Sequence, residues 1–384
     1  MAQKRYLFTP GPTPVPPQVL AALAEPVLHH RAPDFREVYG RVLGRLQEVH
    51  RTESEVLLFT CSGTGAFESA IVSLCSPGER VLAVSAGAFG ERWISMAQTF
   101  GCEVEELRYA WGEIPTADDL RAKLDAIDPV SLVFLVHSET STGVVADVQS
   151  LAAAAKDAGA LVVVDAVSSL GAVPLEMDDW GLDVVVSGSQ KALMAPPGLA
   201  TAAVSPAAWA QVERSTLPSF YFDWQRTRKA QEQLDAAFTP AVSLIVALDI
   251  ALALLLEDGL ETAFERHVRL GRACRAGIKA MGLELFSPDE DRAAVVTAAR
   301  MPEGLESREL TLALRDRHGV TIAGGQGELK NAIFRVGHIG WYDEFDIATA
   351  LNAVEFVLGE LGAPIERGVA ASRALEVYAE GTPV

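Results

Sequence analysis

The fold is indicated by an apolar run that ends in a small polar turn and a lysine, Val184-Val185-Val186-Ser187-Gly188-Ser189-Gln190-Lys191. A second apolar run upstream ends in a carboxylate, Leu161-Val162-Val163-Val164-Asp165. Unbroken runs of Val and Leu are typical of parallel strands buried on both faces, and the ligands of such sheets bind beyond the carboxyl ends of the strands. We therefore expect Lys191 and Asp165 to face one crevice.

Lys191 and Asp165 together have the chemistry that a pyridoxal phosphate ring needs. Burial lowers the pKa of a lysine, and the neutral amine is the form that attacks an aldehyde to give a Schiff base. A carboxylate beside the pyridine nitrogen keeps that nitrogen protonated, so that the ring can accept electrons. From the residues alone, a strand-end surface lysine and a carboxylate that caps the following turn remain open as alternatives.

The chain as a whole predicts an α/β core followed by a smaller α+β unit. Strands are expected at the apolar runs 56–60, 81–85, 132–136, 161–165, 184–187 and 200–204, with helices such as 36–49, 67–74 and 148–158 among them. Beyond them, helices are expected at 243–256, 261–281, 308–317 and 344–361, and strands at 293–299, 320–323 and 333–336. The tail, 364–384, is expected to be a docking helix with a loose end.

These elements predict three parts. Residues 18–260 are expected to form a large domain with a mostly parallel sheet of the seven-stranded type, and 261–384 a small domain. Residues 1–17 are expected to be extended. Five prolines between Phe8 and Pro17 exclude a helix or an inner strand there, so we expect this segment to lie across a surface.

Composition narrows the class of partner and the compartment. A net charge of −19 over 384 residues argues against nucleic acid or an anionic membrane as a partner, because either needs a basic face. The longest apolar segment, 243–256, contains Asp249 and is shorter than the roughly 20 residues that a spanning helix needs. The first residues show no apolar stretch of signal-peptide length, and four scattered cysteines show no metal-binding spacing. We expect free thiols, no metal and a cytoplasmic protein.

Three stretches carry a resemblance to a known family: Asp165-Ala166-Val167-Ser168-Ser169, Ser187-Gly188-Ser189-Gln190-Lys191-Ala192-Leu193 and Pro196-Pro197-Gly198. They resemble the class V aminotransferases, a branch of the fold-type I pyridoxal phosphate enzymes. The nearest members in pattern are alanine–glyoxylate and serine–glyoxylate (or serine–pyruvate) aminotransferases. The resemblance implies a pyridoxal phosphate cofactor, and amino transfer from a small amino acid such as alanine or serine to glyoxylate or pyruvate. It also implies a homodimer with a cross-subunit active site.

Within that resemblance, Lys191 is the Schiff-base lysine, and its amine also moves the proton of the substrate α-carbon as general base and acid. Asp165 holds the pyridine nitrogen, and Val167 belongs to the same cofactor site. Thr64, Gly65 and Ala66 would form the phosphate cup at a helix start, with Gln190 as a further donor. Relatives often carry His or a larger polar residue where this chain has Ala66, so one contact is absent. Taken alone, such a Ser/Gly/Thr turn is usually only a helix cap.

For the remaining contacts, the resemblance leaves an alternative or shows a departure from the family. Phe89 takes the place of the aromatic ring that lies on the cofactor, with an ordinary core residue as the alternative. Thr140 is the first choice for the donor to the phenolic oxygen of the ring, and Ser141 the second. Glu139 would otherwise be only a loop carboxylate. Thr239 keeps a hydroxyl in a segment that reaches the partner subunit's phosphate, although this chain lacks the Tyr or polar residue that several relatives carry just before it.

Arg335 lies within an apolar strand, where an unpaired guanidinium is costly. We expect it to bind the α-carboxylate of the substrate as a fork, with a buried salt bridge as the alternative. Gly11 is expected to let the entry segment close over that carboxylate. The sequence shows no second obvious cation near Arg335, which favours a small donor. Arg31 is a candidate cation that keeps an aspartate-type donor open.

Other functions remain as alternatives. A desulfurase needs a mobile nucleophilic cysteine in a late loop, whereas Cys274 lies in a helical stretch. Some relatives are named as the small subunit of a soluble hydrogenase, so a noncatalytic subunit stays open, although no cluster-binding cysteine pattern exists. Nucleotide-binding glycine patterns are also missing.

Overall fold

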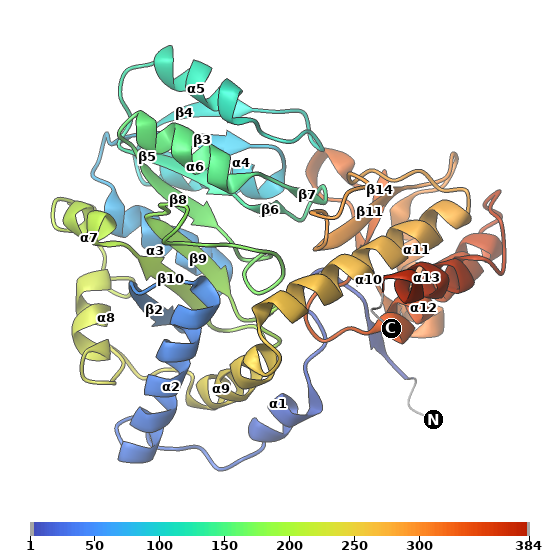
Figure 1. Cartoon of the computed structure of the whole chain (residues 1–384), viewed down its shortest axis with the longest axis horizontal. Coiled ribbons are helices and arrows are strands. Elements are labelled where there is room, and N and C mark those ends of the chain that lie inside the picture. Colours follow the sequence, from blue (N-terminus) through green and yellow to red (C-terminus); the bar gives the residue numbers. More distant parts are fainter. Residues whose placement is uncertain (1–3, 382–384) are drawn as a thin grey trace.

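The computed structural model describes residues 4–381, and its larger part is built on a seven-stranded sheet (Figure 1). In spatial order the strands are β2 (Glu55–Phe59), β10 (Ala200–Val204), β9 (Val184–Gly188), β8 (Leu161–Asp165), β5 (Leu132–Val136), β3 (Arg80–Ser85) and β4 (Glu103–Arg108). Six strands run in one direction, and β10 runs antiparallel to both of its neighbours. The expected mostly parallel sheet is therefore confirmed.

Helices cover both faces of this sheet, as expected from strands that are apolar on both sides. One face packs against α3 (Gly63–Leu74), α4 (Ala88–Thr99) and α7 (Pro206–Val212). The other packs against α1 (Pro17–Ala22), α2 (Pro33–His50), α5 (Ala117–Asp125), α6 (Val148–Asp157) and α9 (Val242–Leu256). No helix within residues 4–381 is long and apolar enough to cross a lipid bilayer.

The two edge strands of the sheet differ in how far they are covered. Beside β2 lies α8 (Trp224–Gln231), whose Gln231 side chain donates to the Val56 carbonyl and accepts from the Leu58 N–H, both at 2.9 Å. The amide thus occupies hydrogen-bonding groups that an open edge strand would expose. At the other edge, β4 has the sequence Glu-Val-Glu-Glu-Leu-Arg and none of its residues is fully buried. It was not expected as a strand, because a half-exposed edge carries no apolar run.

A smaller three-stranded antiparallel sheet lies beside the first, with helices packed around it (Figure 1). Its strands are β11 (Val296–Arg300), β14 (Ile333–Gly337) and β13 (Ala323–Gly324). Its helices are α10 (Leu260–Ala280), α11 (Ser307–His318), α12 (Glu344–Glu360) and α13 (Ala370–Glu380). The tail helix α13 packs against α10 and α12. This part has its own apolar core, which also takes in Phe8.

The entry segment does not lie across a surface, and that expectation is wrong. β1 (Tyr6–Leu7) pairs with β12 (Val320–Thr321), and the Phe8 carbonyl then accepts the Gly337 N–H at 2.9 Å. Farther on, Thr13 donates its N–H to the Gln190 carbonyl and its hydroxyl to the Lys191 carbonyl. The segment thus bonds to β14 of the smaller sheet and to the turn that follows β9 of the larger one. Along it, buried residues alternate with partly exposed ones, as an extended chain allows.

Candidate active site

Lys191 follows β9 after a two-residue turn and is buried at the carboxyl edge of the large sheet. Its Nζ donates to the Pro10 carbonyl at 2.9 Å, so the entry segment is what the amine touches. Burial lowers the pKa of Lys191 to about 8; nearby Asp165 opposes this shift, and the positive charges of Arg335 and Arg92 add to it. Deprotonation of the amine therefore needs a lower pH than it does for an exposed lysine.

Asp165 ends β8, the strand next to β9, and is 4% exposed. Its Oδ1 accepts the N–H of Val167 at 2.8 Å. Burial raises the pKa of Asp165 to about 7, and the positive charges of Lys191 and Arg92 partly offset this. Asp165 and Lys191 lie close enough for the charge of each to shift the pKa of the other.

A cavity of about 260 Å³ opens in front of Lys191. Six of the residues that the sequence singled out contribute to its lining: Gly11, Thr64, Phe89, Val167, Gln190 and Lys191. At one end lies the start of α3, where Gly63 also lines the cavity. The N–H groups of Gly65 and Ala66 both bond to the Ser62 carbonyl inside the helix. Among the described residues, no protein acceptor binds the N–H groups of Gly63 and Thr64, so these two are the donors that α3 offers.

Phe89 lies in the first turn of α4 and lines the cavity together with Arg92, three residues further along the helix. The guanidinium carbon of Arg92 lies 4.7 Å from the centre of the Phe89 ring. Its Nη1 donates to the Thr64 hydroxyl at 2.9 Å, which joins α4 to the start of α3. The sequence did not single out Arg92 or Gly63. The i, i+3 spacing of Phe89 and Arg92 is a signal that points to the arginine.

Thr140 and Ser141 follow β6 (Ser138–Glu139), and their hydroxyls have different hydrogen-bond partners. The Ser141 Oγ accepts the Ala88 N–H at 3.0 Å and donates to the Glu139 carboxylate, so both of its hydrogen-bonding roles are occupied. The Thr140 hydroxyl has one long contact, 3.5 Å from the Ser168 Oγ. Of the two hydroxyls, that of Thr140 therefore has the fewer hydrogen-bond partners among the described residues.

Arg335 lies in β14 and is 4% exposed. Its Nε donates to the Gly324 carbonyl at 2.9 Å and its Nη1 to the Thr140 carbonyl at 2.5 Å, which leaves the rest of the guanidinium for a ligand. No carboxylate among the described residues forms an ion pair with it, so the structure provides no buried salt bridge of the kind weighed as the alternative. Burial lowers the pKa of Arg335 to about 10, while the charge of Glu139 opposes that shift.

Gly11 approaches Lys191 more closely than any side chain could. Its φ is +154°, and a Cβ at this position would lie 2.3 Å from the Cε of Lys191. The entry segment can pass over the lysine only because residue 11 has no side chain.

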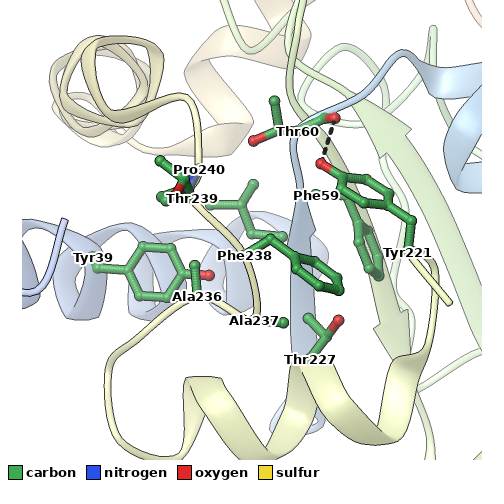
Figure 2. A pocket seen from close by; sticks show the side chains of 11 residues that line it. Tyr39, Phe59, Thr60, Tyr221, Thr227, Ala236, Ala237, Phe238, Thr239 and Pro240 are labelled. Carbon is green, nitrogen blue, oxygen red and sulfur yellow. Dashed lines mark hydrogen bonds between the residues drawn. The ribbon is translucent and has the colours of Figure 1, made fainter.

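Two expected residues are not near Lys191 in the same chain. Thr239 is exposed and lies in a separate pocket between α8 and α9, beside Tyr221 and Phe238 (Figure 2). The Tyr221 hydroxyl donates to the Thr60 carbonyl at 3.3 Å, so this pocket adjoins the strand that leads to α3 (Figure 2). Arg31 lies exposed on the loop between α1 and α2 and does not line the Lys191 cavity.

Comparison with known proteins agrees with this geometry. Residues 5–336 match the family model described as Aminotransferase class-V. The chain belongs to the class V aminotransferase family. This membership identifies the protein as a pyridoxal phosphate-dependent transaminase of fold type I.

Individual relatives match over nearly their whole length. The chain is 43% identical to the soluble hydrogenase 42 kDa subunit of Anabaena cylindrica, over 94% of this chain and 95% of that protein. It is 35% identical to the L-aspartate–glyoxylate aminotransferase of Paracoccus denitrificans, over 100% of this chain and 98% of that protein. The crystal structure of ureidoglycine–glyoxylate aminotransferase from Bacillus subtilis is 30% identical and superimposes with a TM-score of 0.94, covering 99% of each chain.

The residues of the cavity fit pyridoxal phosphate. Gln190 lines the cavity, and its Oε1 is buried without a hydrogen-bond partner among the described residues, so no bond to Oε1 fixes the orientation of the side-chain amide. Turned over, the amide would present its NH₂ as a donor to a phosphate. A Cβ on Gly63 would lie 2.8 Å from the Val167 Cγ2, so the backbone there is packed as closely as a phosphate-binding turn requires. The open N–H groups of Gly63 and Thr64 would hold the phosphate, and the Lys191 amine is the group of this cavity that can bind the aldehyde.

Proposed function

We propose that this transaminase moves the amino group of a small amino acid, alanine or serine, to glyoxylate or pyruvate. What supports the proposal is that Asp165 at the end of β8 and Arg335 in β14 both lie close enough to Lys191, beyond β9, for their charges to shift its pKa. A single buried guanidinium with free donors suits the α-carboxylate of an amino acid. Among the described residues, Arg92 is the other arginine whose charge acts on Lys191, and its Nη1 donates to the Thr64 hydroxyl.

We assign the cofactor contacts as follows. Lys191 would bind the cofactor aldehyde covalently, Asp165 would pair with the ring nitrogen, and Thr140 would donate to the phenolic oxygen. The ring would lie between Phe89 and Val167. The phosphate would be held by Thr64 and Gln190, with Gly63 supplying a backbone N–H that the sequence did not indicate. Ser141, Gly65 and Ala66 shape this site through the contacts described above rather than through their own free donors.

The bound cofactor supplies an electron sink for a bond at the substrate α-carbon. The chain supplies the proton transfer. With a pKa near 8, the Lys191 amine can both take and return a proton at the α-carbon close to neutral pH. Arg335 holds the substrate carboxylate, and the entry segment at Gly11 closes the site against water. Asp165 provides the negative charge that balances a protonated ring nitrogen.

We propose a homodimer in which Thr239 of one subunit completes the partner's site. Thr239 is exposed in its own chain, and the surface around it is apolar: Phe220 is 70% exposed, Tyr221 42% and Leu234 40%. Large apolar side chains gathered at one place on a surface are typical of a protein interface. Light scattering that gives the mass of a dimer supports this arrangement, whereas a monomer with full activity contradicts it.

We also propose the division into an extended segment 1–17, a large domain 18–260 and a small domain 261–384. The largely distinct apolar cores of the two sheets support it, although Phe8 joins the second core, Ala263 and Phe264 join the first, and a small cluster spans both parts. A cytoplasmic location is proposed as well, and the free thiols of all four cysteines are consistent with a reducing compartment.

Two alternatives make different predictions. An aspartate donor is favoured by the similarity to the L-aspartate–glyoxylate aminotransferase, and Arg31 of a partner subunit would be its candidate cation. A noncatalytic subunit is suggested by the name of the Anabaena relative. The complete set of buried site residues favours catalysis, because an unused buried lysine and arginine would only destabilise the fold.

An amino-donor panel tests the proposal. Purified protein loaded with pyridoxal phosphate is given alanine, serine or aspartate, with glyoxylate, pyruvate or 2-oxoglutarate as acceptor, and Lys191→Ala serves as the inactive control. We expect the highest kcat/KM with alanine or serine and with glyoxylate or pyruvate. A preference for aspartate selects the first alternative, and a protein without a visible chromophore or turnover selects the second.

A further inference from the structure

Glu139 is a buried carboxylate to which the assignment above gives no task. It ends β6, directly before Thr140, and is 3% exposed. No Lys, Arg or His of residues 4–381 forms an ion pair with it. An ionised carboxylate in such a place needs several hydrogen bonds to offset its lost hydration.

Those hydrogen bonds come from the start of α4. The Glu139 Oε2 accepts the N–H groups of Phe89 at 2.9 Å and Gly90 at 3.2 Å. Its Oε1 accepts the hydroxyl of Ser141, whose Oγ in turn accepts the Ala88 N–H at 3.0 Å. Three consecutive N–H groups of the first turn are thus bound by one carboxylate and the hydroxyl that it orients. The positive end of the helix also favours a negative charge here.

The turn before α4 is tightly packed against Glu139 and Ser141. The helix has no side-chain cap of its own, because the residue at its N-cap is Gly87. A Cβ on Gly87 would lie 2.5 Å from both the Glu139 Cγ and the Ser141 Oγ. The backbone that leads into Phe89 is therefore pressed directly against the carboxylate, and the position of the Phe89 main chain follows that of Glu139.

We propose that Glu139 is a positioning residue that sets Phe89 against the ring of pyridoxal phosphate, by holding the first turn of α4 through its carboxylate oxygens. The proposal rests on the assignment of Phe89 to the cofactor ring. It goes beyond helix capping, because a cap that only stabilised the fold would act on cofactor binding independently of the Phe89 side chain.

A double-mutant cycle tests it on the full chain. The dissociation constant of pyridoxal phosphate is measured by absorbance titration of the apoprotein, together with the visible circular dichroism of the bound cofactor, for E139A, F89A and E139A/F89A. We expect E139A to weaken binding about tenfold and to change the dichroism, as loss of a supporting residue typically does. In the F89A background, E139A should weaken binding less than about twofold, because the ring it positions is gone.

Two further variants keep the test decisive. In E139Q the amide oxygen can still accept the Phe89 and Gly90 N–H groups, but its NH₂ cannot accept the bonds that Oε1 receives from the hydroxyl and the N–H of Ser141. We therefore expect a loss of affinity of about threefold, smaller than that of E139A. In G87A the added Cβ displaces the carboxylate without removing it, and the expected loss again is about tenfold. G87A replaces E139A in the cycle if E139A does not fold.

The matched control is Asp147, an exposed carboxylate that caps α6 by accepting the Ser150 N–H at 3.1 Å. D147A should lower the unfolding temperature and leave cofactor affinity unchanged. Additive effects of E139A and F89A overturn the proposal, and so does an E139Q variant as weak as E139A. A wild-type apoprotein that binds no pyridoxal phosphate overturns the proposed function itself, a result distinct from both.

Discussion

Substitution of Gly11 by alanine should disable the lysine without unfolding the protein. The new Cβ would lie 2.3 Å from the Cε of Lys191, 2.4 Å from its Nζ and 2.5 Å from its Cδ. Carbon atoms pack at about 3.5–4.0 Å, so the lysine has to retreat by roughly 1 Å. A displacement of about 1 Å at a reacting group costs on the order of 100-fold in rate, or about 2.7 kcal/mol. The φ of +154° adds about 1–3 kcal/mol of backbone strain to the folded state.

The assay separates these two effects. The kcat of Gly11→Ala is measured with the best donor and acceptor, and its free energy of unfolding is measured by urea titration. The control is Gly78→Ala, because Gly78 has a φ of +78° and open space where a Cβ would lie. We expect Gly78→Ala to lose about 1 kcal/mol of stability and no kcat. If Gly11→Ala keeps the wild-type kcat, or if Gly78→Ala loses as much kcat as Gly11→Ala, the reasoning about Lys191 is refuted.

Three further results are expected. Arg335→Lys should raise the KM of the amino donor about 10- to 100-fold with a smaller effect on kcat, because an ammonium cannot form the fork; an unchanged KM would place the carboxylate elsewhere. The native apoprotein keeps a proton on Asp165 up to about pH 7, whereas the unfolded chain releases it near 3.8. Asp165 therefore contributes stability that falls as pH rises from about 4 to 7, by at most about 4 kcal/mol, against the opposite contribution of His50, His137, His267 and His338, whose pKa values burial lowers. The difference in free energy of unfolding between the wild-type protein and Asp165→Asn should change by that amount over this range; parallel curves for the two proteins would contradict that. Arg92→Gln should shift the pH dependence of pyridoxal phosphate attachment to the apoprotein to higher pH, because the charge of Arg92 lowers the pKa of the free Lys191 amine; the exposed Arg108→Gln is the control, and equal profiles would exclude the effect.

The strands that lead to Lys191 and Asp165 could be predicted because strands buried on both faces have continuous apolar sequences. β8 and β9 occupy adjacent places in the sheet, with Asp165 opposite Val186. The fold class and the family followed from these runs and the motifs beside them. β4 could not be found in the same way, because an edge strand with charged side chains has no such run.

The parts of the site that the sequence did not indicate depend on contacts between distant segments. Glu139 holds Phe89 from fifty positions away, and no local pattern distinguishes it from an ordinary loop carboxylate. The burial of the entry segment depends on the gap between the two sheets, which a local run of prolines does not reveal. The N–H of Gly63 is open, whereas that of Gly65 bonds to the Ser62 carbonyl. This difference follows from the residue at which α3 begins.

The most direct test of the central claim is the site of covalent attachment. The protein loaded with pyridoxal phosphate is reduced with borohydride, digested and analysed by peptide mass spectrometry. A pyridoxyl group on the peptide that contains Lys191, and none in Lys191→Ala, is the predicted result. A pyridoxyl group on a different lysine, or equal labelling of the wild-type and variant proteins, would contradict the assignment of Lys191.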